Sequence, residues 1–245
     1  MGRTPWVLAG YHRVMNIRIL VLALTVSLVT APGAVGQGVV VDQGAFSVRL
    51  RGQAVGTEDF VIRRAGMGRE DAVFASGVVR TRIGTATQEV KPLLRASPPD
   101  WSAVSYQVDV TGPDAIDVRI SRTGRRYVAT IRSEIGDEDR EFQAQANTRV
   151  VELGVAHHYY FLRDVREGVA VHVLEPRSRR QVTLTSSAPS DVDLTLGPSL
   201  VSARRVQFDS DQGDLRIVWF DRQGRVLRVE IPSLGYVAER TDLVG

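Results

Sequence analysis

The chain has 245 residues and a formal net charge of +3, from 31 basic and 28 acidic side chains. Arg3, Arg13 and Arg18 carry this excess, since removing the segment before residue 37 leaves 31 − 3 = 28 basic against 28 acidic residues. A balanced charge without a basic cluster argues against nucleic-acid binding. The absence of cysteine excludes disulfides, thiol catalysis and thiolate metal sites.

The segment 1–36 has the pattern of a secretory signal peptide. Arg18 gives a positive flank, an apolar run follows at 19–29, and Ala34 and Gly36 supply the small residues that a signal peptidase reads. The run is about half the ~20 residues that a membrane-spanning helix needs. We therefore expect export to the periplasm or the extracellular space and no stable membrane span after cleavage. Met15 is an alternative start.

Most of the remaining chain, residues 37–245, alternates apolar and polar residues, which predicts strands with one buried and one exposed face. The clearest runs are AFSVRL at 45–50, VSYQVDV at 104–110, AIDVRI at 115–120 and RYVATI at 126–131. Glycine or proline turn signals separate such runs at intervals of about 8 to 12 residues. This pattern predicts one all-β domain built as a sandwich, a barrel or a large curved sheet.

Residues 206–231 predict a three-stranded antiparallel meander, with Gly213 and Gly224 at turns that require positive φ. One segment departs from the strand pattern. Between residues 147 and 163, apolar and aromatic side chains recur at spacings of three and four, which predicts the one substantial helix. Residues 168–176 return to strand.

The stretch ELGVAHHYYFL at 152–162 raises the question of a metal site. Adjacent histidines such as His157 and His158 diverge in either a strand or a helix. A helical zinc motif needs histidines at i and i+4 with a carboxylate between them, and this stretch offers no such partner. We therefore expect no metal and no cofactor. No Gly-x-Ser-x-Gly elbow occurs, although paired carboxylates assembled in space stay open as catalysts.

The aromatic residues have two interpretations. In the first, the aromatic side chains pack in the core, where their rings bury apolar surface. In the second, they line a cavity and contact a ligand. Under the second interpretation the candidate ligand-binding residues are Trp101, His158, Tyr159, Leu162 and Trp219. The arginines of RSRR at 177–180 are similarly either a solvated turn or an anion-binding cluster, and a charge run favours the turn.

Three segments together resemble a family of exported bacterial domains of unknown function. These are GQAVGTEDFVI at 52–62, HHYYFLRDV with GVAVHVLEPR at 157–177, and LRIVWFDRQGRVLRVEIP at 215–232. More loosely, the chain is similar to the half-barrels that carry lipoproteins and lipids across the periplasm. That resemblance implies a strongly curved antiparallel sheet with a helix against its concave face, and it implies no catalytic residue.

The expected function is therefore that of an exported, soluble envelope protein that acts as a binding protein rather than as an enzyme. The concave face of its sheet would bind an apolar ligand, such as a lipid or an acyl chain, or a protein partner. Two alternatives stay open. One is a hydrolase of envelope glycans or lipids with carboxylates assembled in space, and the other is a structural interaction module.

Overall fold

A computed structural model describes residues 38–243, and the expected signal peptide lies outside this range. The described residues form sixteen strands in one sheet. The strands are β1 (Val39–Leu50), β2 (Gln53–Ala65), β3 (Ala72–Ile83), β4 (Ala86–Ser97), β5 (Ser102–Thr111), β6 (Ile116–Thr123), β7 (Arg126–Ser133), β8 (Gly136–Gln143), β9 (Arg149–Val150), β10 (Ala170–Glu175), β11 (Arg180–Ser186), β12 (Ser190–Leu196), β13 (Ser199–Ser210), β14 (Leu215–Phe220), β15 (Val226–Ile231) and β16 (Tyr236–Arg240). Three 3-10 helices join them: η1 (Gly68–Glu70), η2 (Ala156–Leu162) and η3 (Pro232–Leu234).

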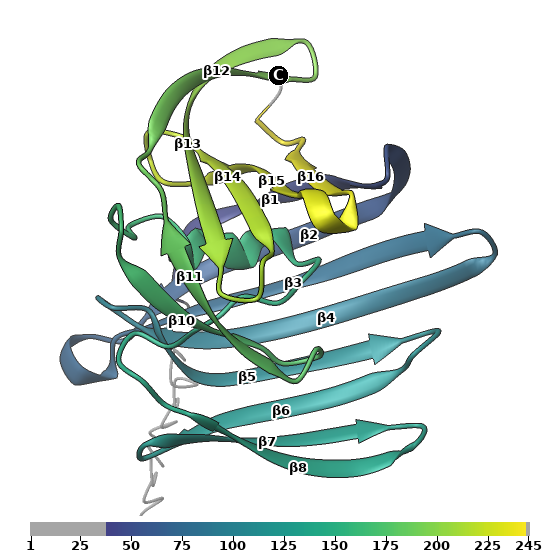
Figure 1. Cartoon of the computed structure of the whole chain (residues 1–245), viewed down its shortest axis with the longest axis vertical. Helices are drawn as coiled ribbons and strands as arrows, with labels where there is room; N and C mark the ends of the chain where they lie inside the picture. Colours follow the sequence, from purple (N-terminus) through teal and green to yellow (C-terminus); the bar gives the residue numbers. More distant parts are fainter. Residues whose placement is uncertain (1–37, 244–245) are drawn as a thin grey trace, which may run out of the picture. The chain divides into compact units, whose positions relative to one another are not determined.

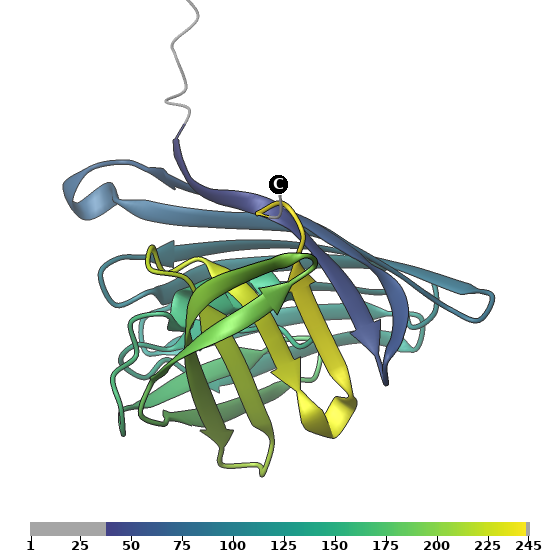
Figure 2. The ribbon, with the colours of Figure 1, turned by 90° about the horizontal axis from the view of Figure 1, so that it is seen from above.

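The first and last strands lie side by side in the sheet. β1 pairs antiparallel with β16, so that Phe46 stands opposite Arg240 and Leu50 opposite Tyr236. The strand order is β8-β7-β6-β5-β4-β3-β2-β1-β16-β15-β14-β13-β11-β10-β9, and β12 pairs with β13 outside this path. Figures 1 and 2 show the meander β1–β8 continuing into the C-terminal strands through this contact. Among the described strands, only the short pair β9–β10 is parallel.

The predicted alternation of strand residues is confirmed. Along β5, Tyr106, Val108 and Val110 are buried, while Gln107 and Asp109 between them are exposed. Successive side chains of a strand point to opposite faces, so one face of the sheet becomes apolar. The expected fold class, a large curved antiparallel sheet with one helix against its concave face, is therefore confirmed.

The turn glycines of the predicted meander are confirmed as well. Gly213 joins β13 to β14 with a φ of +86°, and Gly224 joins β14 to β15 with a φ of +77°. Because L-residues with a Cβ rarely adopt positive φ, these positions favour glycine and set the hairpin registers.

The predicted helix is shorter and of a different kind. The segment expected to be helical at 147–163 instead begins with the short strand β9 and a turn, and only Ala156–Leu162 forms the 3-10 helix η2. All seven residues of η2 are buried. Because η2 is buried on every side, its apolar pattern does not mark where the helix begins and ends.

A second, smaller apolar cluster lies on the other face of β14. Val218 and Phe220 of β14 belong to the main core, whereas Ile217 and Trp219 pack with residues of the β12–β13 hairpin and with Leu227. The hairpin residues in this outer cluster are Leu194, Leu196 and Ala203. β14 is therefore covered on both faces, which explains its nearly continuous apolar sequence.

Side chains connect β8, at one end of the sheet, to the β10–β11 hairpin. The carboxamide of Gln181 accepts a hydrogen bond from the Gln143 backbone N–H at 3.2 Å and donates one to the Gln143 carbonyl at 2.9 Å. Arg179 adds an ion pair to Glu138 at 2.9 Å. These contacts cover part of an edge whose backbone groups would otherwise stay unpaired.

Candidate functional site

The five residues expected to line a ligand cavity are buried, and they divide between the two cores. His158, Tyr159 and Leu162 lie on η2 with at most 1% of their surface exposed. Trp101 is 9% exposed and packs edge-on against Tyr160 and Phe161 of the same helix. Trp219 lies apart from the other four, in the outer cluster on β14.

A buried carboxylate fixes the start of η2. Glu58 of β2 accepts hydrogen bonds from the backbone N–H groups of Ala156 at 2.7 Å and of His157 at 2.8 Å. Its Oε1 also lies 2.7 Å from Nδ1 of His157, and both side chains are fully buried. The His157 ring stacks on Phe60 with a centroid distance of 5.4 Å. One carboxylate therefore satisfies three polar groups that would otherwise be unpaired in the core.

Glu58 is not among the residues predicted from the sequence to form a site, although its position in β2 carries a signal. In the alternation of β2, Glu58 has the same parity as Phe60 and Ile62, which point into the core. A charged residue at an inward position is rarely fully buried unless it is paired. Its partner, His157, is 99 positions away, so no local pattern indicates the pairing.

His158 is held in its neutral form. The backbone N–H of Glu152 donates to Nδ1 of His158 at 3.2 Å, so the ring proton belongs on Nε2. Burial, with His157 and Arg177 nearby, lowers the pKa of His158 well below its ordinary value. The Glu152 carboxylate accepts a bond from the Arg177 backbone N–H at 3.1 Å, yet burial raises its pKa.

Several buried polar atoms have no hydrogen-bond partner among the described residues, and they include Nε2 of His157, Nε2 of His158, Oη of Tyr159 and Oη of Tyr236. Burial raises the pKa of Tyr159 to about 12, and it raises that of Tyr236 well above its ordinary value. The tyrosines therefore stay protonated at neutral pH. The arrangement is a packed polar interior, and neither of the two large hollows at the surface is lined by these residues.

The arginines of the 177–180 run point into the structure rather than forming an anion-binding cluster. Arg177 pairs with buried Glu152 at 3.3 Å, and Arg180 pairs with buried Glu175 at 2.8 Å. Glu175 also pairs with Arg216, which is fully buried on β14. The run is a turn, as expected, but its charges are engaged in half-buried ion pairs rather than fully solvated.

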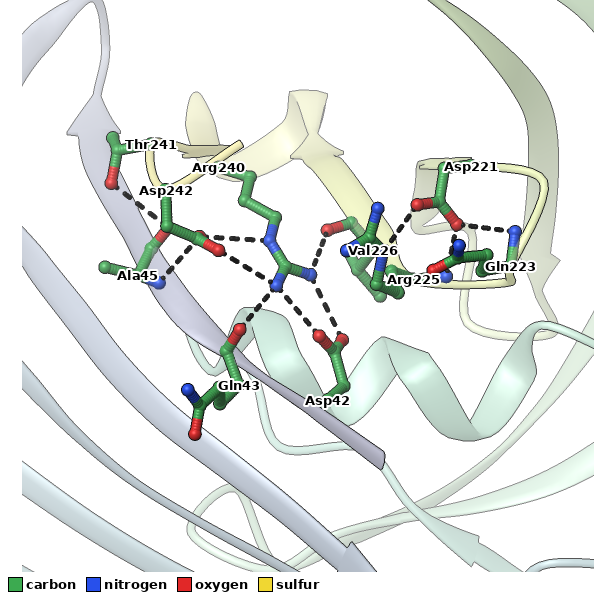
Figure 3. Close-up of polar contacts among 10 residues, drawn as sticks. All are labelled: Asp42, Gln43, Ala45, Asp221, Gln223, Arg225, Val226, Arg240, Thr241 and Asp242. Atoms are coloured by element: carbon green, nitrogen blue, oxygen red, sulfur yellow. Dashed lines mark hydrogen bonds and ion pairs between the residues drawn. The ribbon is translucent and has the colours of Figure 1, made fainter. Parts of the chain in front are cut away.

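A buried ion pair joins β1 to β16 where the two ends of the described chain meet (Figure 3). The guanidinium of Arg240 binds both oxygens of Asp42, at 2.8 and 3.1 Å, and donates to the Gln43 carbonyl at 2.6 Å. Asp242 accepts a further bond from Nε of Arg240 at 3.0 Å and one from the Ala45 backbone N–H at 3.0 Å. This network is structural and leaves Arg240 with 1% of its side chain exposed.

An apolar hollow of about 490 Å³ lies on the outer face of β2, β3 and β4. Val61, Val78 and Leu93 are among its lining residues, with Asp59 and Lys91 as its charged members. Leu93 is 43% exposed. Val61 and Val78 beside it are half-buried, so the apolar lining is accessible from solvent.

A proline interrupts the strand pairing beside this hollow. Pro92 of β4 lacks a backbone N–H and has no β3 partner, and Gly77 and Val78 of β3 are likewise unpaired toward β4. The same register holds on both sides of this gap, with Ser76 opposite Leu93 and Val79 opposite Val90. The ladder between β3 and β4 is therefore interrupted locally without being shifted.

Comparison with known proteins supports the fold alone. No family model and no curated protein matches the chain, and no helix among residues 38–243 has the length and apolar character of a membrane span. The chain is similar to a solved beta-barrel-like protein of domain of unknown function DUF1849 from Brucella abortus, with 10% identity, a TM-score of 0.50, and coverage of 81% of this chain and 94% of that chain. A DUF1089 family protein from Pseudomonas aeruginosa is similar with 11% identity, a TM-score of 0.39, and coverage of 72% and 90%. The likeness to the DUF1849 structure confirms, at the level of the fold, the expected resemblance to β domains of unknown function.

Proposed function

We propose that the chain is an exported, non-enzymatic binding domain of the bacterial envelope, and that it binds an apolar chain such as a lipid acyl group. The observation that carries this proposal is the apolar hollow on the outer face of β2–β4, with Leu93 exposed at its surface. Its volume of about 490 Å³ falls within the range of small-molecule sites, about 300–1,000 Å³.

The outer hollow is a better binding surface than the concave face. The concave side is filled by η2, whose residues are all buried, so a ligand there would have to displace a helix. Displacing it would also leave Glu58 without the three polar groups that it binds. An uncompensated buried charge is strongly unfavourable, which favours the outer face.

Lipid extraction of the purified mature protein, followed by native mass spectrometry with added fatty acid, tests this proposal. The chain should carry a stoichiometric lipid. Leu93→Asp should weaken binding by about tenfold or more, since it places a charge on apolar contact surface. The matched control is Leu200→Asp, a leucine that is 67% exposed on β13 and does not line the hollow. Absence of bound lipid, or equal losses in both variants, would rule out this ligand.

Export is tested separately. Expression of the full chain in a bacterium, with mass spectrometry of the envelope fraction, should yield a mature protein that begins at Gln37. A protein that keeps residues 1–36 in the cytoplasm would contradict the envelope assignment without bearing on the hollow.

A further inference from the structure

A second and larger hollow, of about 610 Å³, lies where the end of η2 meets β12, β13 and the β14–β15 turn. Its charged lining residues are Arg163, Arg204 and Arg222 together with Asp164, Asp191 and Asp221. The formal charges balance, so the character of the hollow depends on which of these groups are already engaged by the protein.

The three arginines have no carboxylate partner. Across residues 38–243, no side-chain ion pair within 4.0 Å involves Arg163, Arg204 or Arg222. Arginines close to them in the chain or in space are paired: Arg225 with Asp221 at 2.6 Å and Arg149 with Asp164 at 3.4 Å. A half-buried guanidinium without a counter-ion is a candidate for anion binding.

Arg163 is held in place by aromatic rings. Its guanidinium carbon lies 3.7 Å from the ring centroid of Tyr160 and 4.5 Å from that of Trp101. One N–H donates to the Tyr160 carbonyl at 3.1 Å. Partial burial lowers the pKa of Arg163, which nevertheless stays charged. The group is therefore preorganised, and an incoming anion would bind without first having to order it.

The neighbouring cation is fixed by the same segment. Arg204 donates a hydrogen bond to the Arg163 carbonyl and lies 5.5 Å above the Phe220 ring. Gly224 allows the close approach of Arg163, since a Cβ at that position would lie 2.6 Å from Cδ of Arg163. Two guanidinium groups are thus fixed beside one hollow, each with N–H donors to spare.

Two of the three aspartates are engaged elsewhere. Asp164 accepts from the indole N–H of Trp101 at 2.6 Å and pairs with Arg149. Asp221 accepts the backbone N–H groups of Gln223 and Arg225, both at 2.8 Å, and the Arg225 side chain (Figure 3). Asp191 is exposed and lies opposite Arg204 in the β12–β13 register. It is therefore the one acid of the lining that is left to compete with an anionic ligand for the arginines.

We propose that this hollow is an oxyanion site that binds a phosphate group between Arg163 and Arg204, with Arg222 at its rim. The planar fork of arginine matches phosphate and carboxylate oxygens, and charge-assisted bonds of this kind are strong. The site is separate from the apolar hollow on β2–β4, and no residue lines both.

Titration of the purified protein with inorganic phosphate, followed by calorimetry and by NMR of arginine Nε–H groups, tests the site. Saturable binding should shift the resonance of Arg163. Arg222→Gln, at an exposed position, should weaken binding severalfold, and Arg204→Gln by about tenfold or more. The control Arg205→Gln removes the same charge from the adjacent position of β13, which does not line the hollow, and should change affinity much less.

Asp191→Asn gives a test in the opposite direction. Removing the competing carboxylate should tighten phosphate binding severalfold, whereas Asp193→Asn, on the same strand outside the hollow, should have a smaller effect. Vesicles of phosphatidylglycerol, compared with phosphatidylcholine, distinguish an anionic lipid headgroup from free phosphate. No saturable binding to phosphate or to anionic vesicles would overturn the proposal, as would binding that is unchanged in both Arg204→Gln and Arg222→Gln.

Discussion

Glu58 Oε1 and His157 Nδ1 lie 2.7 Å apart in the interior, although 99 positions separate them in the chain. This contact attaches the start of η2 to β2, because the same carboxylate accepts the first two backbone N–H groups of the helix. A helix too short to be stable alone is thereby fixed against the sheet by one side chain.

Replacing Glu58 with glutamine should destabilise the protein by about 3 kcal/mol, since one acceptor oxygen becomes a donor facing other donors. Urea unfolding monitored by circular dichroism measures the loss. Glu141→Gln is the control, because Glu141 is 53% exposed and pairs with Arg126 at the surface; it should change stability by less than about 1 kcal/mol. Similar effects of the two substitutions would show that Glu58 does not hold η2.

His158 should make stability fall in mild acid. Its pKa is lowered in the folded protein, whereas in the unfolded chain it titrates near pH 6.5. Below about pH 6.5 the unfolded state therefore binds a proton that the folded state does not, and stability declines by up to about 1.4 kcal/mol per pH unit. Above that pH His158 is unprotonated in both the folded and the unfolded state, so its contribution to the unfolding free energy does not change with pH.

His158→Asn should remove this dependence, since an amide oxygen can still accept the Glu152 N–H. The raised pKa of Glu152 acts in the opposite sense, because protonation relieves its buried charge as pH falls. The quantity to measure is therefore the difference in unfolding free energy between the wild type and His158→Asn. As the pH is lowered from 7 to 5, the variant should become more stable relative to the wild type. His172→Asn is the control, because His172 of β10 is only half-buried. Parallel pH profiles for wild type and His158→Asn would refute the assignment.

Asp42→Ala should destabilise the protein by about 3–5 kcal/mol, since it leaves the guanidinium of Arg240 buried without its bidentate partner. Asp242→Ala should have a smaller effect, because Asp242 is partly exposed and Asp42 still neutralises Arg240. Chemical denaturation of both variants measures this order. If Asp242→Ala were the more destabilising variant, the contact between β1 and β16 would depend on the partly exposed Asp242 instead of on Asp42.

Gly224→Ala and Gly213→Ala form a matched pair of turn substitutions. Both introduce a Cβ at positive φ, and each should destabilise the protein by about 1 kcal/mol or more. A Cβ at Gly213 meets nothing within 4 Å, whereas one at Gly224 displaces Arg163. Phosphate affinity should therefore fall in Gly224→Ala and stay near wild type in Gly213→Ala. Equal affinities would show that the position of Arg163 is irrelevant to binding.

The sequence alone predicted the class of the fold and several of its turns. Strand alternation is a local property, so β5 and the meander β13–β15 were visible in the order of residues, and Gly213 and Gly224 marked turns through their backbone freedom. The helix was less predictable. η2 is buried on every side, so the spacing of its apolar residues carried no information about its length or type.

What only the tertiary structure decided is which distant residues meet. The pairing of β1 with β16, the contact of Glu58 with His157 and the gathering of Arg163 and Arg204 around one hollow all join positions far apart in the chain. It also decided that Trp101, His158, Tyr159 and Leu162 pack in one core while Trp219 packs in another. Periodicity reports which face of a strand is apolar, but burial and charge pairing depend on what the folded sheet brings against that face.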